Sequence, residues 1–118
     1  MPKEIVVMSK LKDVPGCIQL QEYFETHQDY AIVMELPNNV TDLYDYITER
    51  GPLPENEAKY LFQQLVDVVR AIHAQGVVHR DLKDENILID LFTKKLSLID
   101  FGSATFIEDK IYTELVGN

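Results

Sequence analysis

The sequence predicts an α+β fold in which two strands come first, helices follow, and two short strands come last. Three observations carry this prediction. An alternating segment at 17–25 precedes an apolar run at 30–36, a long amphipathic segment spans 54–76, and two short apolar runs occupy 86–89 and 96–99. A parallel α/β sheet needs strands that alternate with helices, and the chain lacks that alternation. The expected class is therefore α+β.

The N-terminal part of the chain is expected to hold the end of a helix and a hairpin. Residues 4–11 have a helical pattern that KDVPG closes. Apolar and polar residues alternate over 17–25, and 30–36 is a continuous apolar run of strand length. Because only the short turn 27–29 separates these two runs, they predict a β-hairpin.

Two helices are expected in the middle of the chain. A short one over 40–51 is stopped by Gly51 and Pro52. The longer one over 54–76 has Gly76 where a C-cap belongs. Its apolar residues recur at intervals of three and four and predict one buried face: Ala58, Leu61, Phe62, Leu65, Val69 and Ile72.

Composition limits the classes of function. The chain has 118 residues, enough for one domain, and its net charge of −9 argues against nucleic-acid binding, which needs clustered Lys and Arg. Net charge alone favours an acid surface that only keeps the chain soluble, although it could attract cationic partners. No apolar run approaches the ~20 residues that span a membrane. The single Cys17 excludes an internal disulfide framework and favours a reducing compartment. We expect a cytoplasmic protein, with a nuclear location also open.

The polar stretch HRDLKDENILID, residues 79–90, is ordered like a reaction site. Asp81 is a carboxylate in a loop between two short strands and could accept a hydroxyl proton. Lys83 could neutralise a phosphate, while Asn86 and Asp100 offer oxygen ligands of the kind that Mg²⁺ prefers. A base, a cation and two oxygen ligands suit phosphoryl transfer. The alternative is that these side chains only cap turns.

The strings HRDLKDEN and DFG occur together, separated by a strand-turn-strand stretch, and match the signature set of protein kinases. The segments ITERG, KDENILID, LIDFGSA and MELPNNVTDLYDYI resemble the PIM family of serine/threonine kinases. The resemblance covers essentially the whole chain, 1–118, and implies a partial kinase domain. Residues 1–36 would be a remnant of the small lobe with the start of the hinge. Residues 37–118 would be the hinge and the first part of the helical large lobe, through the activation loop.

The resemblance implies transfer of the ATP γ-phosphate to Ser or Thr, with Mg²⁺ as the metal. Asp81 would be the catalytic base, and Lys83 would contact the transferred phosphate. Asn86 and Asp100 would hold the metal ions. Five residues would contact the nucleotide in the hinge, near the ribose and below the adenine: Glu35, Leu36, Asp42, Leu88 and Ile99.

The same resemblance gives roles to flanking positions. Met34 would be the gatekeeper, Glu4 the acid that pairs with the nucleotide-binding lysine, and Phe101 and Gly102 would let the metal-binding loop swing. Pro37 has no backbone N–H, so a hinge hydrogen bond to the nucleotide cannot form if it occupies the usual donor position. An ordinary turn proline is the alternative.

Acidic side chains around the cleft select basic peptides in the resembling family, so basic peptides or proteins are the expected substrates. A merely solvated face is the alternative. The most plausible acidic surface is formed by Asp42, Asp45, Asp84 and Glu85. Arg80 could pair with a phosphate in the activation loop. The candidates for that phosphate are Tyr112 and Thr113, with Glu114 as a permanent charge instead.

Two parts of the kinase pattern are missing ahead of residue 30: a Gly-rich G-x-G-x-x-G stretch and a lysine in a strand like V-A-I-K. Glu4 would therefore lack its lysine partner. Because the reaction needs phosphate positioning as well as a base, we expect this chain alone to be weak or inert. The alternative function is a non-catalytic kinase remnant that acts as a binding module or pseudokinase. Apolar residues on helix 55–75 could also be exposed, which invites association.

Overall fold

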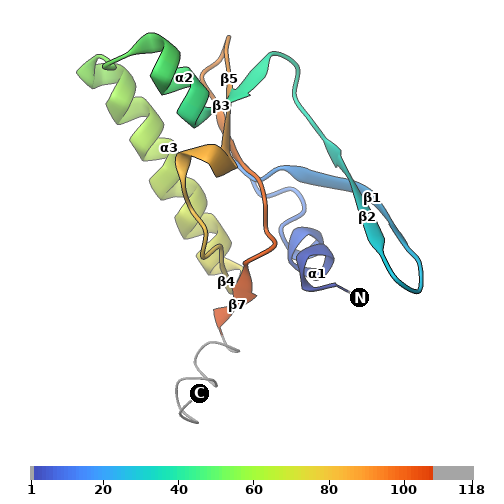
Figure 1. The fold of residues 1–118 in the computed structure, drawn as a ribbon. Helices are drawn as coiled ribbons and strands as arrows, with labels where there is room; N and C mark the ends of the chain where they lie inside the picture. Colours follow the sequence, from blue (N-terminus) through green and yellow to red (C-terminus); the bar gives the residue numbers. More distant parts are fainter. Residues whose placement is uncertain (1, 108–118) are drawn as a thin grey trace.

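The computed structural model describes residues 2–107, and it confirms the α+β class (Figure 1). The elements follow one another as α1 (Lys3–Lys10), β1 (Gln19–Glu25), β2 (Tyr30–Glu35), β3 (Val40–Asp42), α2 (Leu43–Arg50), α3 (Glu55–Ala74), β4 (Val77–Val78), the 3₁₀ turn η1 (Asp84–Asn86), β5 (Ile87–Asp90), β6 (Leu96–Leu98) and β7 (Thr105–Phe106). Within these residues, no helix is long and apolar enough to cross a membrane.

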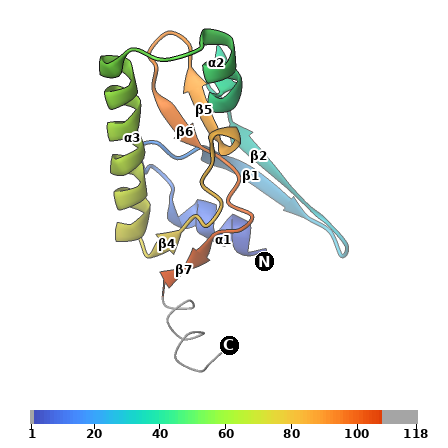
Figure 2. The same cartoon turned by 60° about the vertical axis from the view of Figure 1, so that its left-hand side comes forward.

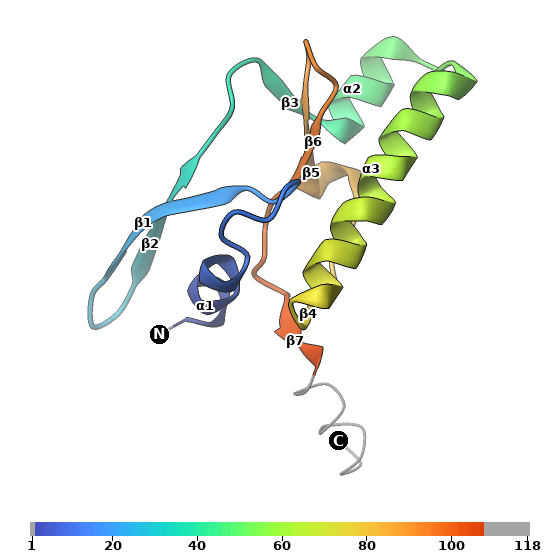
Figure 3. The same cartoon turned by 180° about the vertical axis from the view of Figure 1, so that it is seen from behind.

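Among residues 2–107, the strands form three small antiparallel sheets. The predicted hairpin is confirmed as β1–β2, with Tyr23 opposite Ile32 and a bulge between Leu20 and Glu22. A second sheet has the order β3–β5–β6, and β4 pairs with β7. The hairpin lies on one side of the molecule and α3 on the other, with α1 between them (Figures 1 and 3).

The predicted helix over 40–51 is wrong in its first three residues. Val40 and Thr41 are β-branched and lie in β3, where Thr41 is opposite Ile89 of β5. The helix begins only after Asp42, whose carboxylate accepts a hydrogen bond from the backbone N–H of Asp45 at 2.7 Å. Asp42 is thus an N-cap, which sets the start of α2.

The long helix is confirmed as α3, but its predicted buried face is partly wrong. The side chains of Leu61, Val68 and Ile72 are buried, whereas Phe62 is 67% exposed. α3 contacts β4 and β6 along one side, as Figure 2 shows, and Phe62 lies one position round the helix from Leu61. The residues buried with the α3 stripe come from all parts of the fold: Val7, Met8, Leu11, Leu43, Tyr46, Val77, Ile87, Ile89, Leu96, Leu98 and Phe101.

A close backbone approach joins the N-terminal segment to the second half of the chain. Gly16 has φ +89°, and a Cβ there would lie 2.8 Å from the Cγ2 atom of Val68 on α3. The carbonyl of Gly16 accepts from the N–H of Leu98 at 2.7 Å, and the N–H of Ile18 donates to the carbonyl of Leu98 at 3.0 Å. Glycine is required at position 16 because any side chain would push α3 away.

Candidate active site

The loop between β4 and β5 is held by a buried histidine. His79 is 3% exposed, and its Nδ1 accepts a hydrogen bond from the N–H of Asp81 at 3.2 Å. This places the ring proton on Nε2, which donates to the carbonyl of Ile99 at 2.9 Å. The ring also meets Phe101 edge-on, with the centroids 5.1 Å apart. His79 therefore connects the Asp81 loop to the segment that follows β6.

Asn86 connects the same two segments from the other side. Its Nδ2 donates to both the backbone carbonyl of Asp81, at 2.9 Å, and the carboxylate Oδ2 of Asp81, at 3.1 Å. The backbone carbonyl of Asn86 accepts a hydrogen bond from the N–H of Ile99 at 3.0 Å. Among residues 2–107, no buried side-chain oxygen or nitrogen lacks a partner, and Oδ1 of Asn86 makes no hydrogen bond there.

Asp100 directly follows Ile99, whose backbone binds both His79 and Asn86. Its backbone is left-handed, with φ 58°, which is uncommon for a residue with a side chain. Its Oδ1 accepts a hydrogen bond from the N–H of Gly102 at 3.2 Å, and the residue is exposed. Such strained positions cluster at functional sites, and this one directly follows Ile99, whose N–H binds the backbone carbonyl of Asn86.

Lys83 lies at the rim of this group. Its Nζ is 3.9 Å from Oδ1 of Asp81, and the two side chains are 49% and 39% exposed. An ion pair this long, between side chains this exposed to solvent, contributes little to stability and does not fix the position of the lysine. The left-handed backbone of Arg80, with φ 73°, precedes Asp81 and turns the loop at this point.

Two oxygen-bearing side chains of this loop region, Asn86 and Asp100, have the chemistry that would suit Mg²⁺. Among residues 2–107, no group of three or more His, Cys, Asp or Glu residues could hold a metal by itself. The amide oxygen of Asn86 and the carboxylate of Asp100 make a smaller set. Mg²⁺ is usually bound by one or two protein oxygens plus waters and substrate phosphates, so the set fits this ion and no all-protein metal cage.

The predicted nucleotide-contacting residues fall in two groups. Asp42 and Leu88 are opposite each other in the β3–β5 pair, and Leu88 and Ile99 pack against the core. Glu35, the last residue of β2, and Leu36, which follows it, line a hollow of about 360 Å³. Ser97 lines that hollow as well and is the cross-strand neighbour of Leu88, so β6 joins the two groups.

Contacts of α1 were not predicted from the sequence. Glu4 accepts a hydrogen bond from the hydroxyl of Tyr30 at 3.3 Å, and its charge raises the pKa of that tyrosine. Lys3 donates to Oγ1 of Thr105 at 3.3 Å, which joins α1 to the strand after Gly102. These partners are far apart in the sequence, and no local pattern points to either pair.

The predicted acidic surface lies where α2 packs against η1. The pKa of Asp45 is raised, chiefly by the neighbouring charge of Asp42. Asp42 ends β3, Asp45 lies in α2, and Asp84 and Glu85 belong to η1, so the four carboxylates come from three adjoining elements. Arg80 is exposed, while its predicted partners at 112, 113 and 114 lie outside the described residues.

Comparison with protein families matches the protein kinase domain to residues 1–118. The chain belongs to the protein kinase family. This kinase-family chain is 42% identical to the serine/threonine-protein kinase pim-2 of Danio rerio, over 99% of the chain and 40% of the relative. It is 39% identical to prk-2 of Caenorhabditis elegans, over 99% of the chain and 26% of the relative. A serine/threonine-protein kinase 1 of African swine fever virus is 42% identical over 86% of the chain and 33% of the relative.

The predicted PIM-like, partial kinase domain is therefore confirmed as a family assignment. The kinase-family chain spans less than half the length of the curated relatives it matches.

Proposed function

We propose that this chain carries the base and the metal-binding residues of a serine/threonine protein kinase, which transfers the γ-phosphate of ATP to protein hydroxyls. The observation that carries the proposal is the position of Asn86. Its side-chain amide donates to the carboxylate of Asp81, and its backbone carbonyl accepts from the N–H of Ile99, the residue before Asp100. The names of the related proteins agree with this reaction.

Each residue then has a defined task. Asp81 orients the attacking hydroxyl and accepts its proton. Lys83, 3.9 Å from Asp81, can offset charge on the transferred phosphate. Asn86 and Asp100 would hold Mg²⁺, which neutralises phosphate charge when it is bound with ATP. Because positioning dominates phosphoryl transfer, the hydrogen bonds that fix Asp81 serve the chemistry directly.

The nucleotide would lie between the two halves of the chain. In this proposal, Glu35 and Leu36 begin the hinge, Asp42 lies near the ribose, and Leu88 and Ile99 form the floor below the adenine. Residues 1–36 are then the small-lobe part, and 37–118 continue into the large lobe. The unpaired, buried Cys17 agrees with a reducing compartment, in the cytoplasm or nucleus.

Basic peptides are the substrate class that this surface would favour. Asp42 and Asp45 crowd each other at the start of α2, and a like-charge pair is relieved by a cation. The guanidinium group of a substrate arginine can bind carboxylates in a bidentate manner. Asp84 and Glu85 lie on the turn that α2 contacts and would extend the same surface.

A non-catalytic binding module is the second candidate. It is favoured by the contact of Glu4, whose carboxylate accepts a hydrogen bond from the hydroxyl of Tyr30.

A magnesium-dependent assay separates the two candidates. Nucleotide affinity and phosphotransfer are measured with and without Mg²⁺, on the chain, on Asp100→Ala and on Asp67→Ala, a distant surface acid. The kinase proposal expects nucleotide binding that strengthens with Mg²⁺ and loses this dependence in Asp100→Ala alone. Binding that ignores both the ion and the substitution would favour the binding module.

A further inference from the structure

A hollow of about 460 Å³ lies between α3, β6 and the segment that follows α1. Its lining is mostly apolar and comes from all three parts: Pro15, Leu65, Val68, Ala71, Leu96 and Leu98. None of the residues proposed above for catalysis, metal binding or nucleotide contact lines it. A hollow of this size with an apolar lining is typical of a site for a small organic molecule.

Hydrogen bonds between the elements fix the walls of this hollow. Nε2 of Gln64 on α3 donates to the carbonyl of Lys94 at 2.8 Å, and its Oε1 accepts from the N–H of Leu96 at 2.9 Å. The carbonyl of Gly16, which also lines the hollow, accepts from the N–H of Leu98 at 2.7 Å. Because these walls are held without a ligand, binding orders few groups and costs little entropy.

The polar side chains of the lining differ in whether they have a partner. The hydroxyl of Tyr60 donates to the carbonyl of Thr93 at 3.4 Å. Oδ1 of Asp67 accepts from Nε2 of Gln63 at 2.9 Å. Within residues 2–107, Nζ of Lys95 makes no hydrogen bond or ion pair. This side chain lines the hollow and is exposed, so its charge is available to a ligand.

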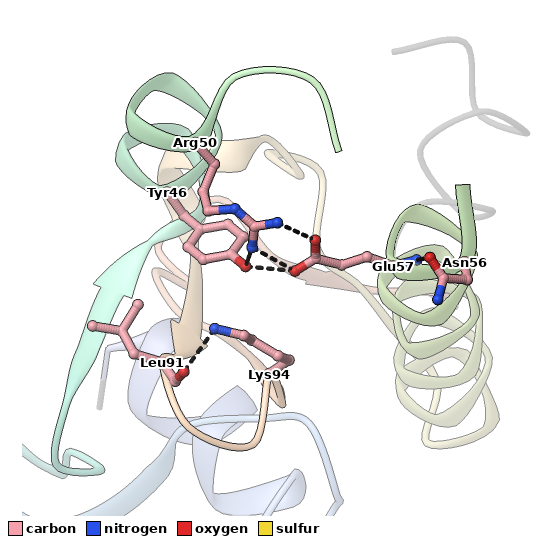
Figure 4. Close-up of polar contacts among 6 residues, drawn as sticks. All are labelled: Tyr46, Arg50, Asn56, Glu57, Leu91 and Lys94. Atoms are coloured by element: carbon pink, nitrogen blue, oxygen red, sulfur yellow. Dashed lines mark hydrogen bonds and ion pairs between the residues drawn. The ribbon is translucent and has the colours of Figure 1, made fainter. Parts of the chain in front are cut away.

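The adjacent cation, Lys94, is held by other partners (Figure 4). Its Nζ donates to the carbonyl of Leu91 at 2.7 Å and lies 5.1 Å from the centroid of the Tyr46 ring. The Tyr46 hydroxyl donates to Oε1 of Glu57 at 2.5 Å, and Arg50 pairs with the same carboxylate at 2.8 Å. The hydrogen bonds from Arg50 and Tyr46 lower the pKa of Glu57, so this carboxylate stays ionised near neutral pH and offsets the nearby cations. The charge of Lys94 is therefore compensated within the protein.

We propose that this hollow binds a small amphipathic anion, an organic molecule with an apolar body and one negatively charged head group. The apolar body displaces water from the surfaces of Leu65, Ala71 and Leu98, which favours binding. The ammonium of Lys95, on its flexible stem, pairs with the head group at the opening. The carboxylate of Asp67 is the charge in the lining that opposes an anion.

The test compares three probes that share an eight-carbon chain and differ in the head group: octanoate, octylammonium and 1-octanol. Each is titrated at low salt into the full chain labelled with ¹⁵N, and the shifts of the amide signals give both the affinity and the position of the site. Octanoate should bind most tightly, and the amides that shift most should belong to the residues that line the hollow. Because neither Asp81 nor Asp100 lines it, the result does not depend on phosphotransfer.

Charge variants test the role of Lys95. Lys95→Gln should weaken octanoate binding roughly two- to fivefold, the size expected for an exposed ion pair, and leave 1-octanol binding unchanged. Asp67→Asn should strengthen octanoate binding, because it removes the opposing charge. Lys59→Gln is the matched control and should keep the wild-type affinity, since Lys59 does not line the hollow and pairs with Glu55, 3.3 Å away.

A variant that fills the hollow tests the position of the site. Ala71 is half-buried in the lining, so Ala71→Phe should occupy the hollow and abolish saturable binding of all three probes. Ala74→Phe adds the same ring at an exposed position of α3 outside the hollow and should keep the binding. If Ala71→Phe fails to fold, Lys95→Gln still tests the proposal, because Lys95 is exposed.

Several results would overturn the proposal. Octanoate binding that folded Ala71→Phe retains, or amide shifts that map away from the hollow, would place the ligand elsewhere. Equal wild-type affinities for octanoate and octylammonium, or an octanoate affinity that Lys95→Gln leaves unchanged, would remove the preference for an anion. A wild-type chain without saturable octanoate binding would contradict it outright.

Discussion

The side-chain amide of Asn86 donates to both the backbone carbonyl and the carboxylate of Asp81, at 2.9 and 3.1 Å, five residues earlier in the chain. One amide group thus fixes the shape of the loop and the direction of its carboxylate. Asn86 is 7% exposed, so water cannot easily replace these bonds.

The first prediction concerns this relationship. Asn86→Ala should lower the free energy of unfolding by about 1–3 kcal/mol, because the carbonyl and the carboxylate of half-buried Asp81 lose the donor that buried Asn86 supplies. Chemical denaturation measures the change. Asn56→Ala, which removes an exposed amide that accepts from the N–H of Glu57, should change stability by less than about 0.5 kcal/mol. Equal losses from the two substitutions would contradict the anchoring role of Asn86.

The pH dependence of stability should report the state of Glu57. Its pKa in the folded chain is below the ordinary value of 4.5, so its contribution is fully present above that value. The contribution is lost as the pH falls through the lowered folded-state pKa. The difference in melting temperature between the wild-type chain and Glu57→Gln should therefore be largest near neutral pH and shrink below pH 4.5. A difference that grows on acidification would refute this assignment.

Cys17 should be unreactive in the folded chain. Burial raises the pKa of its thiol from 9.0 to about 11, and the residue is 7% exposed. Because only the thiolate attacks alkylating reagents, labelling at pH 8 should be slow and should accelerate with denaturant in step with unfolding. Rapid stoichiometric labelling of the native chain would be the contrary result. The free thiol of glutathione in the same assay gives the reference rate.

Two apolar residues of α3 should behave in opposite ways. Ile72 is fully buried, so Ile72→Ala should cost about 2–5 kcal/mol of stability. Phe62 is 67% exposed, so Phe62→Gln should leave stability nearly unchanged and reduce association at high protein concentration. Denaturation and light scattering on the same samples measure both effects. A large stability loss in Phe62→Gln would show that its ring is packed in solution.

Local patterns in the sequence were enough to predict the hairpin, the long helix and the site loop. The alternation before Tyr30 and the signature around Asp81 each lie within a few residues. The prediction of a helix over 40–51 failed at Val40 and Thr41, because these residues pair with β5, a strand far along the chain. Their β-branched side chains are compatible with a strand, but the pairing partner decides whether one forms.

The same limit applies to the site. The sequence was enough to predict Asn86 and Asp100 as candidate site residues from their side-chain chemistry. It was not enough to predict that their two segments meet at Ile99. That meeting depends on the backbone of Ile99, since its carbonyl binds His79 and its N–H binds the carbonyl of Asn86. The order of side chains along the sequence carries no information about such backbone contacts.

The paired hydrogen bonds between Leu98 and the Gly16–Ile18 segment have an effect on the site itself. Leu98 lies two positions before Asp100. The register of its hydrogen bonds with the N-terminal segment therefore determines the position of the Asp100 carboxylate. Inserting or deleting a single residue in the connection after α1 would shift this alignment and displace a proposed metal ligand that is remote in sequence. Tolerance to length changes there should be far lower than an exposed connecting loop would suggest.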